Sequence, residues 1–415
     1  MDHVLGFKCM LCGATYALDE IDYVCPLHGD AGIVDVQYDY KRIRGRVKRA
    51  SLAAGDKAGM WRYKPLLPVA PDAPLPPLRV GWTPLYAAPR LAAPLQLQHL
   101  WIKDDGLNPT ASFKDRASAL AVVKAQEIGA MTVTTASTGN AAAALAGLAA
   151  SVGLAAVIFV PKAAPPAKIA QHLIYGARVL LVDGSYDDAF DLTLQVAREF
   201  GWYNRNTAYN PFMTEGKKTA AYEICEQLDW QAPDRIFVPV GDGCILGGIH
   251  KGLKDILALG WIDRMPKLMG IQSEGSAVLV DAFERDLDAC QVTPGAAGTV
   301  ADSISASLPR DRAKALAAVR ETRGRFLSVS DTEILAAIPT VAQKTGVFCE
   351  PAAAAAYAGL AKAVTQGLVD AEERVVLLLT GSGLKDVASA MRTVTAPPVI
   401  PARLDAVREL LQRAE

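Results

Sequence analysis

The sequence contains no long uninterrupted hydrophobic run and almost no excess of charge of either sign. No apolar stretch approaches the roughly 20 residues that a helix needs to cross a bilayer. The first residues also lack the basic segment and apolar core of a signal peptide. The formal net charge is −1, so the composition does not favour binding to nucleic acid or to an anionic membrane. We therefore expect neither of these as a partner.

Cysteine is too scarce for a protein held together by disulfides. Seven cysteines in 415 residues, an odd number, indicate a reducing compartment, and we expect the cytoplasm. The apolar fraction of 51% with 21% charged residues is typical of a globular chain. The length is sufficient for two or three domains with a large buried core.

Four potential metal ligands are concentrated in the first 30 residues. Cys9 and Cys12 are separated by two residues, as are Cys25 and His28, and twelve residues lie between the pairs. This is the spacing of a zinc ribbon, in which a glycine after each pair permits a sharp turn. Three thiolates and one imidazole suit a closed, structural zinc site. The alternative is a ribbon that has lost its metal and carries free thiols.

From about residue 100, strands and helices are expected to alternate. Short runs rich in Val and Ile end in Gly, Ser or Asp turns, and Ala-rich helical stretches follow. This order predicts an α/β fold of doubly wound parallel sheets. Ligands of such folds bind beyond the carboxyl ends of the strands. The predicted strands are 131–136, 155–160, 177–183, 236–240, 268–272 and 375–379.

One lysine is expected at the start of a helix. Residues 107–116 (LNPTASFKDR) form a loop that leads into residues 117–126, a stretch without Gly or Pro that should be helical. Lys114 then lies in the first helical turn, where the helix dipole disfavours an ammonium. This lowers the lysine pKa and favours the neutral amine, which can attack a carbonyl. From these residues alone, a surface lysine paired with Asp115 is the more common outcome.

Three further turns carry groups that could bind a ligand. The glycine-rich turn 241–248 (GDGCILGG) precedes a helix, and its N–H groups could bind a phosphate, although such turns also serve packing. The turn 137–140 (STGN) could bind a carboxylate or simply cap a helix. Thr380, in TGSG at 380–383, could place a neutral hydroxyl against a pyridine nitrogen as a weak partner, or belong to an ordinary turn.

Together these segments resemble the threonine synthases among the fold-type II pyridoxal-phosphate enzymes. The resemblance also covers the Trp-Arg-Tyr connector at 61–63, GWTPL at 81–85 and Cys-Glu-Pro at 349–351, where we expect Glu350 to form wall and packing. It implies two doubly wound, open parallel-sheet domains. The expected organisation is a zinc-ribbon-like segment at 1–40, a connector at 41–80, a large cofactor-binding domain at 81–106 and 212–395, a small α/β domain at 107–211, and a C-terminal helix or tail at 396–415.

The resemblance also implies roles for individual residues. Lys114 is expected to hold pyridoxal 5'-phosphate as a Schiff base and to act as the catalytic base. Asn140 is expected to meet the ring hydroxyl and Thr380 the ring nitrogen. The residues expected to bind the cofactor phosphate are Gly241, Asp242, Gly243, Cys244 and Ile245. Those expected to bind the substrate carboxylate are Ser137, Thr138, Gly139 and Asn140. We expect an amino acid as the small-molecule substrate, and a homodimer.

The implied reaction converts O-phospho-L-homoserine and water to L-threonine and phosphate by elimination and replacement. Two positions depart from the family pattern: Asp242, where asparagine is frequent, and Met213, where a basic residue would contact the substrate phosphate. Lys217, Lys218 or Arg205 could compensate for Met213. Two alternatives stay open. One is a related lyase or β-replacement enzyme, such as a serine/threonine ammonia-lyase or a cysteate synthase-like enzyme. The other is a zinc-ribbon binding module fused to an inactive cofactor-binding body.

Overall fold

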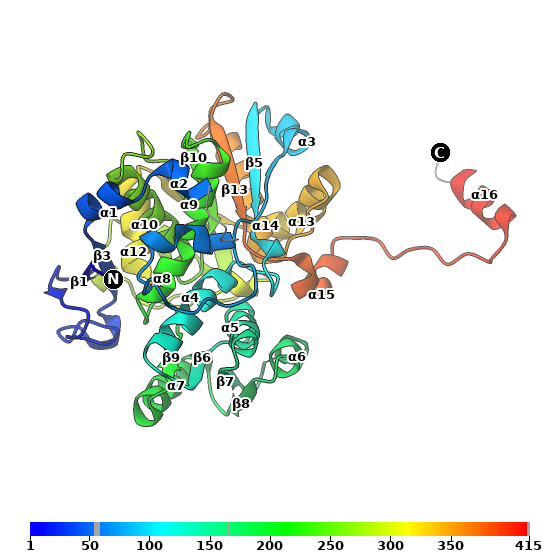
Figure 1. The fold of residues 1–415 in the computed structure, drawn as a ribbon. Helices are drawn as coiled ribbons and strands as arrows, with labels where there is room; N and C mark the ends of the chain where they lie inside the picture. Colours follow the sequence, from blue (N-terminus) through cyan, green and yellow to red (C-terminus); the bar gives the residue numbers. More distant parts are fainter. Residues whose placement is uncertain (54–58, 165, 413–415) are drawn as a thin grey trace.

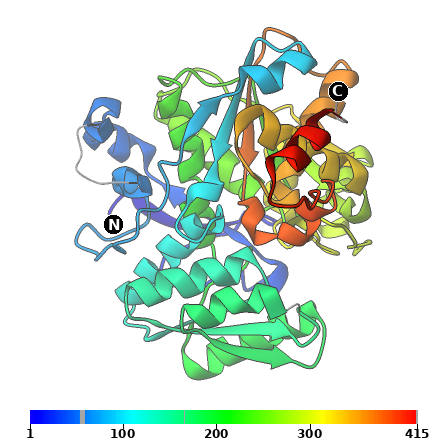
Figure 2. The ribbon, with the colours of Figure 1, turned by 90° about the vertical axis from the view of Figure 1, so that its right-hand side faces the viewer.

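The computed structural model describes residues 1–53, 59–164 and 166–412. These residues form three sheets, of three, four and six strands, together with helices that pack on both faces of the two larger sheets (Figures 1 and 2). The three-stranded sheet belongs to the N-terminal segment. The two larger sheets form the α/β body.

The N-terminal sheet is antiparallel and has the order β2-β1-β3. Its elements are β1 (Val4–Cys9), β2 (Thr15–Tyr16), the short 3-10 helix η1 (Gly29–Ala31) and β3 (Val34–Tyr38). The chain then continues through α1 (Tyr40–Arg46), α2 (Arg49–Ala53) and the 3-10 helix η2 (Gly59–Leu66).

The four-stranded sheet is parallel throughout, in the order β8-β7-β6-β9. Its strands are β6 (Thr132–Ala136), β7 (Ala155–Pro161), β8 (Arg178–Val182) and β9 (Tyr203–Asn204). Successive side chains of β7 point to opposite faces, so Ile158 packs with α4 and α5 while Phe159 packs with α7. The helices of this unit are α4 (Lys114–Glu127), α5 (Asn140–Ser151), α6 (Pro166–Ile174) and α7 (Tyr186–Phe200).

The six-stranded sheet has the order β12-β11-β10-β13-β5-β4, and all its pairings are parallel except that of β4 with β5. Its strands are β4 (Leu85–Ala87), β5 (His99–Asp104), β10 (Arg235–Pro239), β11 (Lys267–Ser273), β12 (Arg325–Val329) and β13 (Arg374–Leu379). The central strand β13 buries five consecutive apolar residues, as expected for a strand covered by helices on both sides.

Two layers of helices enclose this sheet. One layer packs with Val376 and Leu378 of β13, and the other packs with Val375, Leu377 and Leu379. The first layer is α9 (Thr219–Gln227), α10 (Cys244–Ala258), α11 (Val278–Glu284) and α12 (Arg312–Glu321). The second is α3 (Pro89–Ala92), α13 (Asp331–Thr345) and α14 (Pro351–Thr365).

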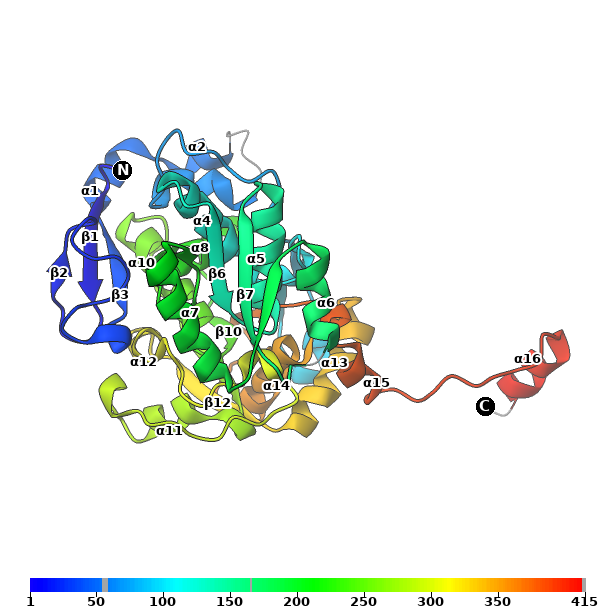
Figure 3. The same ribbon diagram turned by 90° about the horizontal axis from the view of Figure 1, so that it is seen from below.

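The remaining elements are short or lie at the end of the chain. They are α8 (Phe212–Lys217), α15 (Val387–Met391), α16 (Leu404–Gln412) and the 3-10 helices η3 (Ala93–Leu95), η4 (Asp105–Leu107), η5 (Glu274–Ser276), η6 (Ala289–Gln291), η7 (Asp302–Ile304) and η8 (Gly383–Lys385). Helix α16 lies away from the body at the end of an extended segment (Figures 1 and 3). Within the described ranges, we find no helix both long and apolar enough to cross a membrane.

The N-terminal sheet packs directly against the helices of the larger unit (Figure 3). The carbonyl oxygen of Val36 accepts a hydrogen bond from Lys251 Nζ at 2.8 Å. The carboxylate of Asp35 lies 3.4 Å from the ammonium groups of both Lys251 on α10 and Lys314 on α12. Ion pairs therefore connect the sheet to α10 and α12, the two helices beside the glycine-rich turn at 241–248.

The fold class predicted from the sequence is confirmed: this is an α/β protein with doubly wound parallel sheets. Each of the six predicted strands is present, with ends that differ by one residue at most. The three sheets fall in the segments for which separate units are expected. The boundaries between those units stay a prediction.

Candidate active site

A cavity of about 570 Å³ lies at the carboxyl ends of the parallel strands. Its wall is formed by the residues that follow β6, β7, β10 and β13, by the start of α4 and by the segment 302–310. Strand ends from both large sheets therefore meet around one space, which is where ligands bind in open parallel folds.

Lys114 is the first residue of α4, as predicted, and it lines the cavity. The loop before it is fixed to the last strand of the large sheet, because Phe113 donates its N–H to the carbonyl oxygen of Thr380 at 2.8 Å. The pKa of Lys114 is lowered, chiefly by burial, with Glu350 acting in the opposite direction and Arg205 lowering it further. Burial therefore shifts Lys114 toward the neutral amine.

The ordinary alternative for Lys114, a surface ion pair with Asp115, is wrong. Asp115 is buried and accepts hydrogen bonds from both the backbone N–H and the hydroxyl of Thr110. It therefore fixes the loop that precedes the helix. No ion pair of Lys114 is found within the described part of the chain, so its amine is available to the cavity.

The glycine-rich turn connects β10 to the N-terminus of α10 at the cavity wall. Gly243 has φ +91°, and a Cβ on Gly241 would lie 2.8 Å from the Cα of Ile304. The carboxylate of Asp242 accepts a hydrogen bond from the backbone N–H of Arg310 at 3.3 Å. Its pKa is raised by burial. The hydrogen bond from Arg310 acts in the opposite direction, but burial is the larger cause, and the raised pKa reduces the repulsion that this acid would exert on a phosphate at the turn.

The turn at 137–140 leads into α5, with Gly139 as its N-cap and Asn140 as its first residue. The Ser137 hydroxyl accepts the N–H of Gly139 at 3.3 Å. The amide of Asn140 donates to both carboxylate oxygens of Glu350, at 3.1 and 2.9 Å. The pKa of Glu350 is raised by burial, although Asn140 and Lys114 act to lower it. A buried carboxyl group therefore lies beside the lysine.

The cavity brings together all the residues predicted to bind cofactor or substrate. These are Lys114, Ser137, Thr138, Gly139, Asn140, Gly241, Asp242, Gly243, Cys244, Ile245 and Thr380. Tyr186, Ser303 and Arg310, which the sequence did not single out, also line it, as do Arg205, a candidate to compensate for Met213, and Glu350 of the Cys-Glu-Pro motif. The Cys-Glu-Pro motif gave a reason to look at Glu350. Segment 302–310 carries no motif that would reveal its position.

Of the three cations that could compensate for Met213, the structure excludes Lys218. Its ammonium lies 2.6 Å from Glu215 and 2.7 Å from Asp255, so its charge is already balanced. Met213 itself is fully buried in an apolar core. Arg205 and Lys217 stay candidates.

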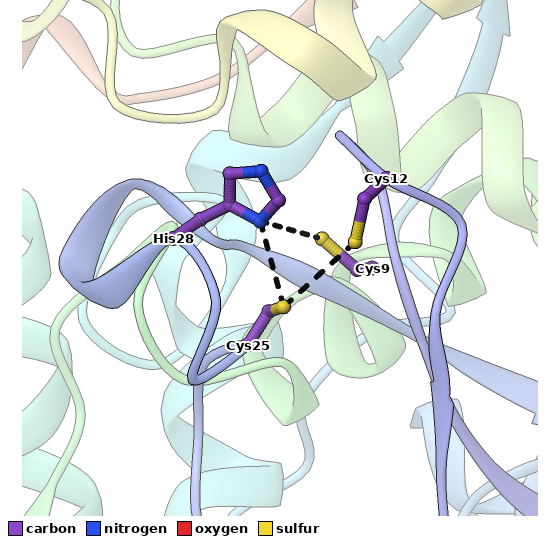
Figure 4. A group of neighbouring side chains, drawn as sticks. All are labelled: Cys9, Cys12, Cys25 and His28. Carbon is purple, nitrogen blue, oxygen red and sulfur yellow. Dashed lines mark hydrogen bonds between the residues drawn. The ribbon is translucent and has the colours of Figure 1, made fainter.

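The four predicted metal ligands form a cluster at one end of the N-terminal sheet (Figure 4). Their ligand atoms all lie within 4.8 Å of one another. His28 Nδ1 is 3.6 Å from the sulfur of Cys25 and 3.9 Å from that of Cys9, and the sulfurs of Cys12 and Cys25 are 4.0 Å apart. Three thiols and one imidazole converging in this way fit the donor set of a tetrahedral zinc site.

A family model described as "Pyridoxal-phosphate dependent enzyme" matches residues 77–381. Threonine synthase of Methanocaldococcus jannaschii is 39% identical over 98% of this chain and 99% of its own length. The chain belongs to the threonine synthase family of pyridoxal-phosphate-dependent enzymes. Threonine synthase of Methanosarcina acetivorans is 40% identical over 97% of this chain and 98% of its own length. Threonine synthase-like lyase chemistry and the pyridoxal-phosphate cofactor follow from this membership.

Solved structures with the same fold include other activities. A processed threonine deaminase isoform from Solanum lycopersicum has a TM-score of 0.65 and 23% identity, over 75% of this chain and 87% of its own. Maize serine racemase has a TM-score of 0.62 and 20% identity, over 80% of this chain and 92% of its own. At these identities the likeness establishes the fold-type II architecture alone.

The residues of the cavity fit pyridoxal phosphate. The turn at Gly241–Gly243 offers backbone N–H groups at a helix N-terminus, where a side chain on Gly241 would collide with Ile304. A lysine with a lowered pKa lies in the same wall, as an amine that binds an aldehyde requires. These features do not support the alternative in which a zinc-ribbon binding module is fused to an inactive cofactor-binding body.

Proposed function

We propose that this enzyme forms L-threonine and phosphate from O-phospho-L-homoserine and water. The observation that carries the proposal is the convergence of Lys114 and the three predicted turns on one cavity, in a chain aligned over nearly its whole length with threonine synthases. The bound cofactor would supply an electron sink for a carbanion.

We assign the protein groups as follows. The neutral amine of Lys114 removes and returns protons at the substrate carbons, because its lowered pKa leaves it unprotonated at lower pH than an ordinary lysine. The N-terminal turn of α5, from Ser137 to Asn140, binds the substrate carboxylate through its N–H groups and hydroxyls. With the cofactor bound, Thr380 would meet its ring nitrogen and Asn140 its ring hydroxyl. The turn from Gly241 to Ile245 would hold the cofactor phosphate.

Product analysis of the holoenzyme decides the substrate. O-phosphohomoserine, threonine, serine and O-phosphoserine are supplied separately. Threonine and inorganic phosphate in equal amounts from the first are the expected result. A ketoacid from threonine or serine at a far higher kcat/KM, with no phosphate from O-phosphohomoserine, would identify an ammonia-lyase. Turnover only of O-phosphoserine with sulfite would identify a β-replacement enzyme.

We also propose a structural zinc ion at Cys9, Cys12, Cys25 and His28. All four positions of a tetrahedral ion would be filled by protein, which leaves none for a substrate. Metal analysis of protein purified without added metal should give one zinc per chain. Cys12→Ser should lower this content, whereas Cys290→Ser, which changes another exposed cysteine outside the cluster, should not. Less than a tenth of an equivalent in the unmodified protein would refute the site.

We propose a homodimer, which light scattering coupled to size-exclusion chromatography would test. We propose a cytoplasmic location, supported by seven cysteines that are all free in the described part of the chain.

A further inference from the structure

Two buried cations in and behind the cavity wall lack an acidic partner. Arg205, just after β9, is fully buried and lines the cavity. Its Nε donates to Ser118 Oγ at 3.1 Å, but neither terminal nitrogen has a hydrogen-bond partner among the described residues. A buried guanidinium with unused donors is costly unless an anion completes it.

Lys217 extends this cationic region. It is the last residue of α8, is fully buried, and donates to the hydroxyl of Thr207 at 2.5 Å. Thr207 itself lines the cavity, so the ammonium lies directly behind a cavity hydroxyl. Burial lowers the pKa of Lys217 to about 8 and that of Arg205 to about 10.

Nearby acids do not neutralise this pair. No carboxylate of the described residues lies within 4.0 Å of Arg205 or Lys217. Two carboxyl groups act on the pair at longer range only. Asp115 acts on Arg205 and is already bound by Thr110, and the buried Asp311 acts on Lys217. With Lys114, three basic side chains therefore lie close enough for their charges to repel one another: Arg205 lowers the pKa of Lys114, and both lower the pKa of Lys217.

We propose that Arg205 and Lys217, with Thr207 between them and the cavity, form a binding site for the dianion of a phosphate monoester. A phosphate accepts several charge-assisted hydrogen bonds at once and balances two positive charges. Both the cofactor and the proposed substrate carry such a group. The assignment of this site to the substrate phosphate rests on the proposed function. The existence of a phosphate site does not.

Four variants test the site. In Arg205→Gln and Lys217→Met, an unpaired buried charge is removed, so Tm without phosphate should stay equal or rise. The matched control is Lys218→Met: Lys218 is the next residue and equally buried, but it is paired with Glu215 and Asp255. Its loss leaves Glu215 without its cation and Asp255 with Lys251 alone, so Tm should fall while phosphate binding is retained. Arg205→Lys should keep most of the phosphate affinity.

Two binding measurements identify which phosphate is bound. Titration of cofactor-free protein with pyridoxal phosphate and with pyridoxal gives the affinity contributed by the cofactor phosphate. Thermal shift of the holoenzyme with inorganic phosphate, together with KM for O-phosphohomoserine, reports on the substrate phosphate. Loss of a charge-assisted contact should weaken the affected binding roughly ten- to hundredfold.

The two measurements distinguish a site for the cofactor phosphate from a site for the substrate phosphate. A loss confined to the ratio of pyridoxal phosphate to pyridoxal affinity assigns the site to the cofactor. A loss confined to inorganic phosphate and KM assigns it to the substrate. Unchanged phosphate affinities in both assays, or a fall in Tm as large as that of Lys218→Met, would overturn the proposal. A holoenzyme that binds inorganic phosphate through this pair but makes no threonine would refute the proposed function and leave the site standing.

Discussion

Two groups of buried charges in this protein differ in how they are balanced. In the first, here called the ion cluster, Lys103 lies 2.7 Å from Glu223, and Arg116 lies 2.6 Å from both Glu223 and Asp105; all four side chains are fully buried. In the second, Arg205 and Lys217 are equally buried but have no acid at ion-pair distance among the described residues.

The ion cluster contributes to the stability of the fold. Arg205 and Lys217 form the proposed binding site for an anionic ligand. The ion cluster joins β5, α4 and α9, and its members satisfy one another. Removing one partner there leaves buried charge uncompensated. Removing an unpaired cation relieves such a cost, so the fold should tolerate it while a ligand is lost. Functional sites commonly retain such locally unfavourable arrangements.

The largest effect is expected from Lys114, the cavity lysine proposed to hold the cofactor and to act as the base. Lys114→Ala should abolish the borohydride-reducible adduct with the cofactor and reduce the rate at least about a thousandfold, because a nucleophile and base are lost together. Lys114→Arg, which keeps the charge but not the amine, should be equally inactive. Both variants should unfold at urea concentrations close to those of the unmodified enzyme. A reduced adduct at another lysine would show that Lys114 is not the attachment site.

A large loss of stability is expected from the ion cluster. Glu223→Ala leaves Lys103 and Arg116 without their shared carboxylate and should lower the free energy of unfolding by about 3–5 kcal/mol. The matched control is Glu321→Ala, since Glu321 also contacts two basic residues, His250 and Lys254, but is half exposed. That change should cost less than about 1 kcal/mol. Equal losses in urea unfolding would remove the distinction between the two sites.

The smallest effect concerns the protonation of Lys114. Burial lowers its pKa from the ordinary 10.5, so the amine should become neutral, and therefore reactive, at lower pH. Reductive methylation of cofactor-free protein, followed by mass spectrometry over a pH series, measures the midpoint for this one residue. A midpoint below 10.5 is expected. A midpoint at or above that value would contradict the lowered pKa and weaken the assignment of Lys114 as the base.

The sequence was sufficient for the apolar strands and for the turns that line the cavity. Strand β13 is a continuous apolar run and was predicted, whereas β5 was not, because it contains Lys103 and Asp104. Both are buried. The ammonium of Lys103 is balanced by Glu223, 120 residues away along the chain, and also donates to Thr83 and Gln227. No local pattern contains that information.

The same limit applies within the cavity. The ten residues around Lys114 favoured a surface pair with Asp115, but Asp115 is held by Thr110. The contact of Asn140 with Glu350 joins residues 210 positions apart. The sequence motifs identified the functional side chains. The neighbouring residues that shift their pKa values are brought together only by tertiary packing.

The contacts of the N-terminal sheet also bear on the order in which the protein assembles. The hydrogen bond from Lys251 to Val36 spans 215 positions, and Lys314 follows later still. A chain synthesised at about 5–20 residues per second leaves that sheet without its docking helices for roughly 10–40 seconds. A segment of this size has too small a core to fold unaided, and a bound metal commonly supplies the missing stability. With the proposed zinc, metal capture would occur during synthesis, well before the glycine-rich turn exists to receive the cofactor.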